Sequence, residues 1–250
     1  RYLLSKIAFL FSKFFFQDSK LLSSYESKGV YLTEDFLPEK DFSKVQEEFS
    51  KIFDDEKRAR NAYKNSPDQK NSSIDYYLYE FEDNIFNNHN YPNLYQVLKN
   101  KKINDFFKFA EKKKKIHLYM RLERVFTKDQ LKNDDNAHWH VDTYHNTHKG
   151  WIYLTDVKKE NGLYNYIVGS NKFSFERLLW EYLNSIKTIY LFFIAKDSKK
   201  FENKKLEVIR NKNSFMISNT HGYHRRGDSE AHQVRDAISF YTRENPFKII

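Results

Sequence analysis

Cysteine is missing from this 250-residue chain, and glycine and proline are scarce, with 6 and 4 residues. The absence of cysteine excludes disulfide bonds, thiolate-ligated zinc and a cysteine nucleophile. No run of about 18 or more apolar residues occurs, so the sequence predicts no ordinary membrane-spanning helix. Five of the six glycines lie between Gly150 and Gly227, which predicts short strands and tight turns in the C-terminal half.

Basic residues outnumber acidic ones, 43 to 34, which gives a formal net charge of +9. This balance favours anionic partners, although general solubility explains it equally well. No nucleic-acid-binding motif is present, so we expect no nucleic-acid partner. A small-molecule substrate is expected instead, and the positive charge weakly favours an anionic one. The sequence leaves the oligomeric state open.

The N-terminal segment is apolar and aromatic, but serine and lysine interrupt it between Tyr2 and Phe16. Three interpretations stay open: a signal-peptide core, an interfacial amphipathic helix, and a helix packed on the core. Residues 1–16 are therefore a candidate for peripheral membrane contact. We assign residues 1–28 to a helical extension and residues 29–250 to a single domain.

The hydrophobic periodicity changes along the chain. Phe42, Val45 and Phe49 recur at helical spacing, and residues 91–110 predict one or two helices. From Ile116, apolar and polar residues alternate as in a strand. Further strands are expected at 151–157, 164–168, 189–194, 206–209, 214–217 and 237–241, with a helix at 175–186. The pattern indicates a mainly β fold with flanking helices. It suggests a core over about 116–243 that is a jelly roll or a related double sheet, covered by N-terminal helices.

A His-x-Asp pair, His140 and Asp142, stands out against this background. On a strand, alternation would turn both side chains to the same face. Two imidazoles and one carboxylate are the ligands of the non-haem Fe(II) facial triad, which leaves coordination positions open. A distant histidine must complete the set, and both His221 and His224 are available. His138 shares the same strand face and is a rival to His140.

Several segments resemble, in order, the phytanoyl-CoA dioxygenase-like branch of the Fe(II)/2-oxoglutarate-dependent oxygenases. They are Trp139–Asp142, Ile152–Val157, Glu160–Gly162, Val168–Ser170, Asn219–Gly227 and Arg235. The sequence departs from the family pattern at Leu163, Asn171 and Asn219, and none of these positions is an iron ligand in that pattern.

The resemblance implies that the core is a double-stranded β-helix (a cupin-like jelly roll) and that it holds a metal site. His140, Asp142 and His224 would bind Fe(II), since the family spacing to the downstream arginine selects His224 over His221. Arg235 would hold the distal carboxylate of 2-oxoglutarate, because a guanidinium matches a carboxylate bidentately. Two further candidates for contacting 2-oxoglutarate lie on the preceding strand, Tyr119 and Arg121. We expect His145 and His148 in a loop at the substrate entrance or in solvent.

The implied reaction is hydroxylation of an aliphatic C–H by O2, with release of succinate and CO2. Asp142 favours hydroxylation, since relatives that halogenate lack this carboxylate. A cytoplasmic location is expected for an enzyme that needs reduced iron. The alternative is a non-catalytic or 2-oxoglutarate-independent metal-binding protein of the cupin type.

Overall fold

A computed structural model describes residues 19–55, 60–61, 74–80, 90–128, 135–142, 146–172 and 204–242. The strands are β1 (Val30–Thr33), β2 (Arg60–Asn61), β3 (Ile74–Glu80), β4 (Leu118–Thr127), β5 (His148–Tyr153), β6 (Tyr164–Ile167), β7 (Lys205–Glu207), β8 (Phe215–Asn219), β9 (His224–Arg226) and β10 (Val234–Thr242). The helices are α2 (Ser19–Lys28), α3 (Glu39–Ser50), α4 (Pro92–Leu98) and α5 (Lys101–Glu111), with a π-helical turn at Lys51–Asp55 and a 3₁₀ turn at Asp135–Ala137.

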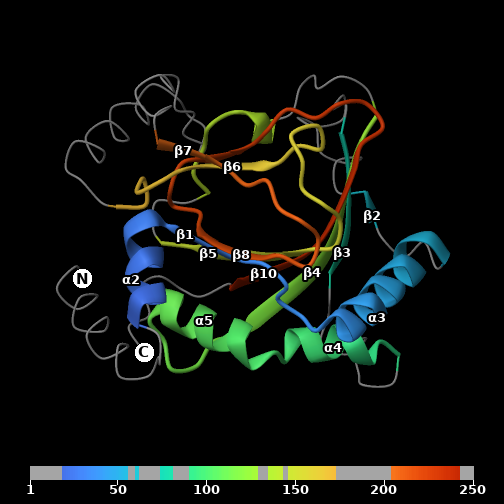
Figure 1. The fold of residues 1–250 in the computed structure, drawn as a ribbon, viewed down its shortest axis with the longest axis horizontal. Helices are drawn as coiled ribbons and strands as arrows, with labels where there is room; N and C mark the ends of the chain where they lie inside the picture. The colour runs from blue at the N-terminus through green and yellow to red at the C-terminus, as the bar shows by residue number, and fades with distance from the viewer. Residues whose placement is uncertain are drawn as a thin grey trace.

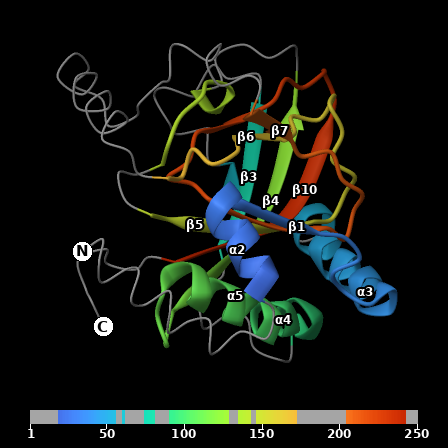
Figure 2. The same ribbon diagram turned by 60° about the vertical axis from the view of Figure 1, so that its left-hand side comes forward.

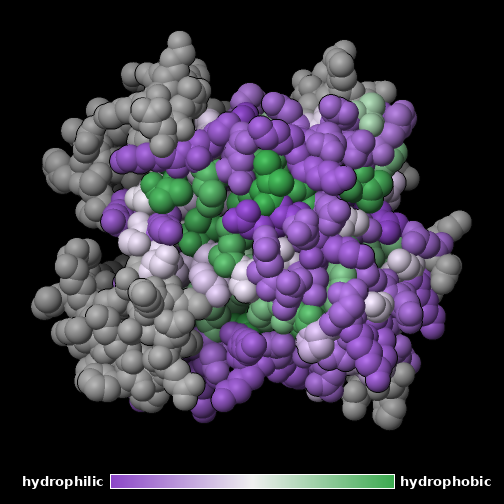
Figure 3. All heavy atoms as spheres, in the orientation of Figure 1, coloured by the Kyte–Doolittle hydropathy of each residue, from purple (hydrophilic) through white to green (hydrophobic). Residues whose placement is uncertain are grey.

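Two antiparallel sheets form the body of the molecule. The larger sheet has the order β1-β8-β5-β10-β4-β3-β2, and the smaller has the order β7-β6-β9. Figure 1 shows the small sheet facing the large one, with the helices on the far side of the large sheet. Figure 3, drawn in the orientation of Figure 1, shows hydrophobic side chains in a band between hydrophilic ones. The expected mainly β jelly roll with flanking helices is confirmed.

The helices cover one face of the large sheet, as both ribbon views show (Figure 2). Residues of α3, α4 and α5 share one buried cluster with alternate residues of the two central strands, Met120 and Leu122 of β4 and Ile238 and Phe240 of β10. Strand side chains alternate between faces, so the residues between these apolar positions point away from the helices. The other face of the large sheet is thereby available to line a site.

Most predicted elements agree with the structure. Residues 91–110 form two helices, because a new helix begins after Asn100. The side chain of Asn100 caps α5 by accepting hydrogen bonds from the backbone N–H groups of Lys102 and Ile103. The strand predicted at 151–157 ends at Tyr153. The helix predicted at 175–186, the strand at 189–194 and the segment 1–16 lie outside the described residues. Within the described part, no helix has the length and apolar character needed to cross a membrane.

The expectation that residues 138–142 form a strand is wrong. His140 makes only an isolated antiparallel bridge, to His224, and no named strand includes this segment. The bridge uses two backbone hydrogen bonds, both of 3.0 Å. Extended chain without a continuous ladder is enough to bring the two histidines together.

Arg124 fastens the helical layer to the large sheet. Its Nε and Nη2 donate to the two carboxylate oxygens of Asp236, at 2.8 and 2.9 Å, and Nη1 donates to Asp54. The guanidinium also lies over Phe49 and Phe53, 5.6 and 5.0 Å from the ring centroids. Burial raises the pKa of the Asp236 carboxyl, and Arg124 lowers it. The buried carboxylate therefore depends on Arg124 for compensation.

We expect Arg124→Ala to destabilise the fold by about 3–5 kcal/mol, because it leaves a buried carboxylate without its partner. Urea denaturation at neutral pH measures this. The control is Lys128→Ala, which breaks a more exposed ion pair of 3.1 Å with Asp75 and should cost less than about 1 kcal/mol. Equal losses in the two variants would contradict the assignment.

Candidate active site

The antiparallel bridge between His140 and His224 organises the site. Next to it, the Asp142 N–H donates to the Thr220 carbonyl at 3.1 Å, which fixes the chain carrying the carboxylate. One ligand atom from each of His140, Asp142 and His224 lies within 4.8 Å of the others. Among the described residues, this is the group of histidine and acidic side chains arranged to hold a metal ion.

Both histidines are oriented by backbone carbonyls. His140 Nδ1 lies 2.7 Å from the carbonyl of His138, and His224 Nδ1 lies 3.0 Å from that of Gly222. A carbonyl only accepts hydrogen bonds, so each Nδ1 must carry the proton. Each Nε2 then presents its lone pair, and that of His224 lies 3.5 Å from Asp142 Oδ1. This orientation of metal-binding imidazoles through the second nitrogen is general in proteins.

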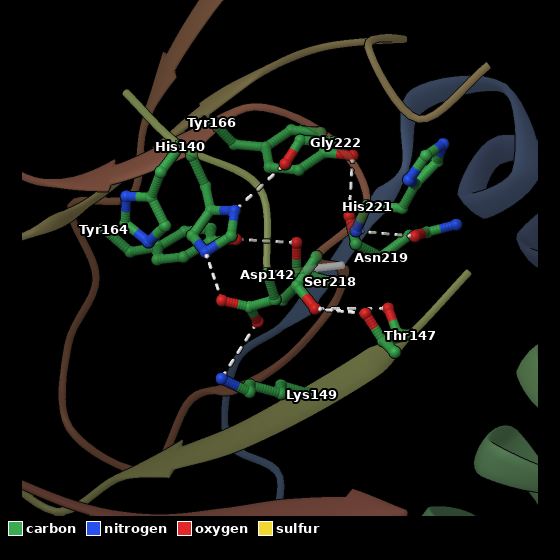
Figure 4. Close-up of polar contacts among 12 residues, drawn as sticks. His140, Asp142, Thr147, Lys149, Tyr164, Tyr166, Ser218, Asn219, His221 and Gly222 are labelled. Atoms are coloured by element: carbon green, nitrogen blue, oxygen red, sulfur yellow. Dashed lines mark hydrogen bonds and ion pairs between the residues drawn. The ribbon is translucent and has the colours of Figure 1, made fainter. Parts of the chain in front are cut away.

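The charge states of His140 and Asp142 suit a divalent cation. Burial, helped by the neighbouring His224, lowers the pKa of His140 to about 4, so the ring is neutral at physiological pH. Burial alone would raise the pKa of Asp142, but Lys149 and His224 hold it well below its usual range. Figure 4 shows the Lys149 side chain reaching Asp142, with 2.9 Å between Nζ and Oδ2. Two imidazoles and one carboxylate are the donor set of Fe(II) sites with open positions.

Tyr164 forms a wall beside the group. Its ring stacks on that of His224, with 5.5 Å between centroids, and its hydroxyl lies 2.9 Å from Ser218 Oγ. Figure 4 shows this contact between Tyr164 and Ser218 beside Asp142. Burial raises the pKa of Tyr164 well above its usual value, so the phenol stays protonated. The ring shields one side of the metal position from water.

A cavity of about 220 Å³ opens at this group. It is lined by Tyr76, Arg121, Glu123, Val125, Asn136, His140, Asp142, Lys149, Trp151, Tyr153, Tyr164, His224, Arg225, Arg226, Arg235 and Ala237. Arg235 thus shares the cavity with the three candidate ligands, and its Nη1 donates to the Gly162 carbonyl. Burial lowers the pKa of Arg235, and the charge of Arg226 acts in the same direction.

The other sequence candidates lie in different surroundings. Arg121 lines the cavity, whereas Tyr119 is not among the lining residues and stacks on Tyr241, with 5.4 Å between centroids. His138 is exposed and contributes its carbonyl. His221 is buried outside the ligand group, where its N–H donates to Asn219 Oδ1.

His148 was expected in a loop near the entrance, and this is wrong. It is the first residue of β5, is buried, and lies 2.6 Å through Nδ1 from the Tyr25 hydroxyl. His145 lies outside the described residues. Sequence reasoning missed Lys149 and Tyr164. Alternation along the strand that follows the motif groups Lys149 with Trp151 and Tyr153, and this signal could have pointed to Lys149.

Comparison with known proteins agrees with this site. Residues 25–188 match the family model described as phytanoyl-CoA dioxygenase (PhyH). The chain belongs to this family and is thereby an enzyme of the non-haem iron, 2-oxoglutarate-dependent class. The match includes His140 and Asp142, while His224 and Arg235 lie beyond it. No curated protein sequence matches the chain.

Solved structures share the fold at low sequence identity. The epimerase SnoN, in complex with Fe³⁺, alpha-ketoglutarate and nogalamycin RO, is 12% identical with a TM-score of 0.59, covering 89% of this chain and 81% of its own. HygX from Streptomyces hygroscopicus, with nickel and 2-oxoglutarate bound, is 14% identical with a TM-score of 0.58, covering 93% and 91%. EctD from S. alaskensis, with bound Fe, is 11% identical with a TM-score of 0.60, covering 90% and 76%.

We expect His140→Ala and His224→Ala each to weaken metal binding by more than about 100-fold, since altering even an outer-shell partner costs 10- to 100-fold. Anaerobic calorimetry with Fe(II), or with Ni(II) as a redox-inert substitute, measures the affinity. His138→Ala is the matched control, because this exposed side chain lies outside the ligand group. Unchanged metal affinity in His224→Ala would contradict the assignment of His224 as a metal ligand.

Proposed function

We propose that the chain hydroxylates an aliphatic C–H of a small molecule, with consumption of O2 and 2-oxoglutarate and release of succinate and CO2. The observation that carries the proposal is the pairing of the His140, Asp142 and His224 group with Arg235 in one cavity. Three protein ligands leave coordination positions for a chelating keto acid and O2. A metal site alone would not need a buried arginine in the same cavity.

Each side chain has a separate role in this proposal. His140, Asp142 and His224 hold Fe(II), and Arg235 receives the distal carboxylate of 2-oxoglutarate. O2 is the oxidant, which bound iron would activate, and 2-oxoglutarate would supply two electrons as it is converted to succinate and CO2. The protein orients them and excludes water, and Tyr164 and Trp151 provide aromatic walls for this. Of Tyr119 and Arg121, the two further candidates that the sequence offered, only Arg121 lines the cavity.

The reaction outcome depends on how the substrate is positioned. SnoN, which shares the fold, is an epimerase, so the fold does not fix hydroxylation. Asp142 supports hydroxylation over halogenation here, since the carboxylate occupies the position a halide would need. A cytoplasmic location is part of the proposal, because a reducing compartment keeps the iron as Fe(II).

Anaerobic addition of Fe(II) and 2-oxoglutarate should produce the weak visible charge-transfer band of a chelated keto acid. In Arg235→Ala, the 2-oxoglutarate concentration needed for half of this band should rise about 10- to 100-fold, because a charge-assisted hydrogen-bonded pair is lost. Visible titration measures this. Arg210→Gln, at an exposed ion pair with Glu34, is the control.

Succinate formation with O2 then tests turnover, and a product heavier by one oxygen atom tests hydroxylation. Iron binding without the visible band would favour a cupin-type metal protein that does not use 2-oxoglutarate. A band without any succinate would favour a non-catalytic binding protein.

A further inference from the structure

The cavity carries more positive charge than the proposed cosubstrate needs. Five basic side chains line it, against two carboxylates, Glu123 and Asp142. A divalent metal ion and the 2-oxoglutarate dianion cancel one another, so adding both leaves the excess of three positive charges in place. A concave surface with such an excess favours an anionic ligand beyond 2-oxoglutarate.

The strand register places the cations at two ends of the sheet face. Arg235 lies opposite Val125, and Tyr241 lies opposite Tyr119 on one side and Lys149 on the other. Arg235 and Tyr241 are six residues apart on β10, which is about 20 Å at about 3.4 Å per residue. The backbone positions of Lys149 and Arg235 therefore lie at opposite ends of the cavity-lining face of the large sheet.

Arg121 belongs to the Tyr241 end. Its Cα lies opposite Ser239, and its guanidinium carbon lies 4.1 Å from the centroid of the Tyr241 ring. The side chain thus leans away from Arg235 and toward the strand position of Lys149. Arg226 belongs to the other end, since its guanidinium lies 5.8 Å from the ring of Tyr76, which pairs with Val125. Glu123 stands between the two ends on β4.

The Tyr241 end adjoins the metal group and solvent. Lys149 contacts Asp142, and its side chain is 43% exposed. Arg121 and Tyr241 are half-buried. A molecule arriving from solvent would meet these cations beside the metal ligands, whereas a five-carbon diacid anchored at Arg235 would extend from the opposite end.

We propose that the substrate is a small molecule bearing an oxyanion, a carboxylate or phosphate, which Arg121 and Lys149 bind at the Tyr241 end of the cavity. The inference rests on the proposed function. It gives Arg121 to the substrate rather than to 2-oxoglutarate. A planar guanidinium stacked on an aromatic ring presents its N–H groups edge-on, in the geometry that carboxylate and phosphate oxygens accept.

The test uses the full chain loaded with Ni(II) and saturating 2-oxoglutarate. This form of the protein cannot turn over, because Ni(II) is redox-inert. Calorimetric titration compares hexanoate, hexyl phosphate and hexan-1-ol, which share a tail and differ in charge. We expect the anions to bind at least about 10-fold more tightly than the alcohol, and Arg121→Gln to weaken the anions about 10- to 100-fold. The same variant should leave the 2-oxoglutarate affinity unchanged. Arg210→Gln, outside the cavity, should change neither.

The better of the two anions identifies the group as phosphate or carboxylate. Equal binding of anions and alcohol, or no anion binding with 2-oxoglutarate in place, would overturn the proposal. Weaker 2-oxoglutarate binding in Arg121→Gln would also overturn the proposal, because Arg121 would then contact 2-oxoglutarate rather than the substrate. Failure of the wild type to bind 2-oxoglutarate with Ni(II) would instead reject the proposed function itself.

Discussion

The short antiparallel bridge between His140 and His224 is the constraint on which the site depends. Two backbone hydrogen bonds of 3.0 Å align segments that lie far apart in the sequence. The alignment needs close packing behind it: a Cβ on Gly222 would lie 2.0 Å from the hydroxyl of the fully buried Tyr166. Glycine at 222 therefore lets the chain pass Tyr166 while its carbonyl orients the His224 ring.

Alternation along β4, β5 and β10 connects the core to this chemistry. Leu122, Ile152 and Ile238 face the helices and join the main buried cluster. Their neighbours on the other face, Glu123, Trp151 and Ala237, line the cavity. A shift of one residue in register would exchange the two faces and bury charge against the helices. The apolar burial that stabilises the domain thereby also fixes which side chains meet the substrate.

Local patterns predicted the fold class and the His140–Asp142 pair, whereas the choice of His224 over His221 came from the family resemblance. Strand alternation from Ile116 and helical spacing from Phe42 need only near neighbours. The state of residues 138–142 was mispredicted, since a single bridge to a distant segment replaces a ladder there. His148 was misplaced for a related reason: its partner, Tyr25, comes from α2, and no local pattern signals that contact. The Lys149–Asp142 pair likewise depends on β5 packing beside the motif.

Arg124 shows how an interaction on the helix side of the sheet can position a residue on the cavity side. Asp236 is held on the helix-covered face of the large sheet by Arg124. Its own backbone N–H also donates to Thr155 Oγ1 at 3.1 Å. Its neighbour Arg235 must then point to the opposite face, into the cavity. In the proposed function, the guanidinium of Arg235 must start from a fixed backbone position to bind the distal carboxylate of 2-oxoglutarate. The Arg124–Asp236 ion pair on the helix-covered face fixes that backbone position. The same short part of β10 would then contribute both to the stability of the fold and to the proposed binding of the cosubstrate.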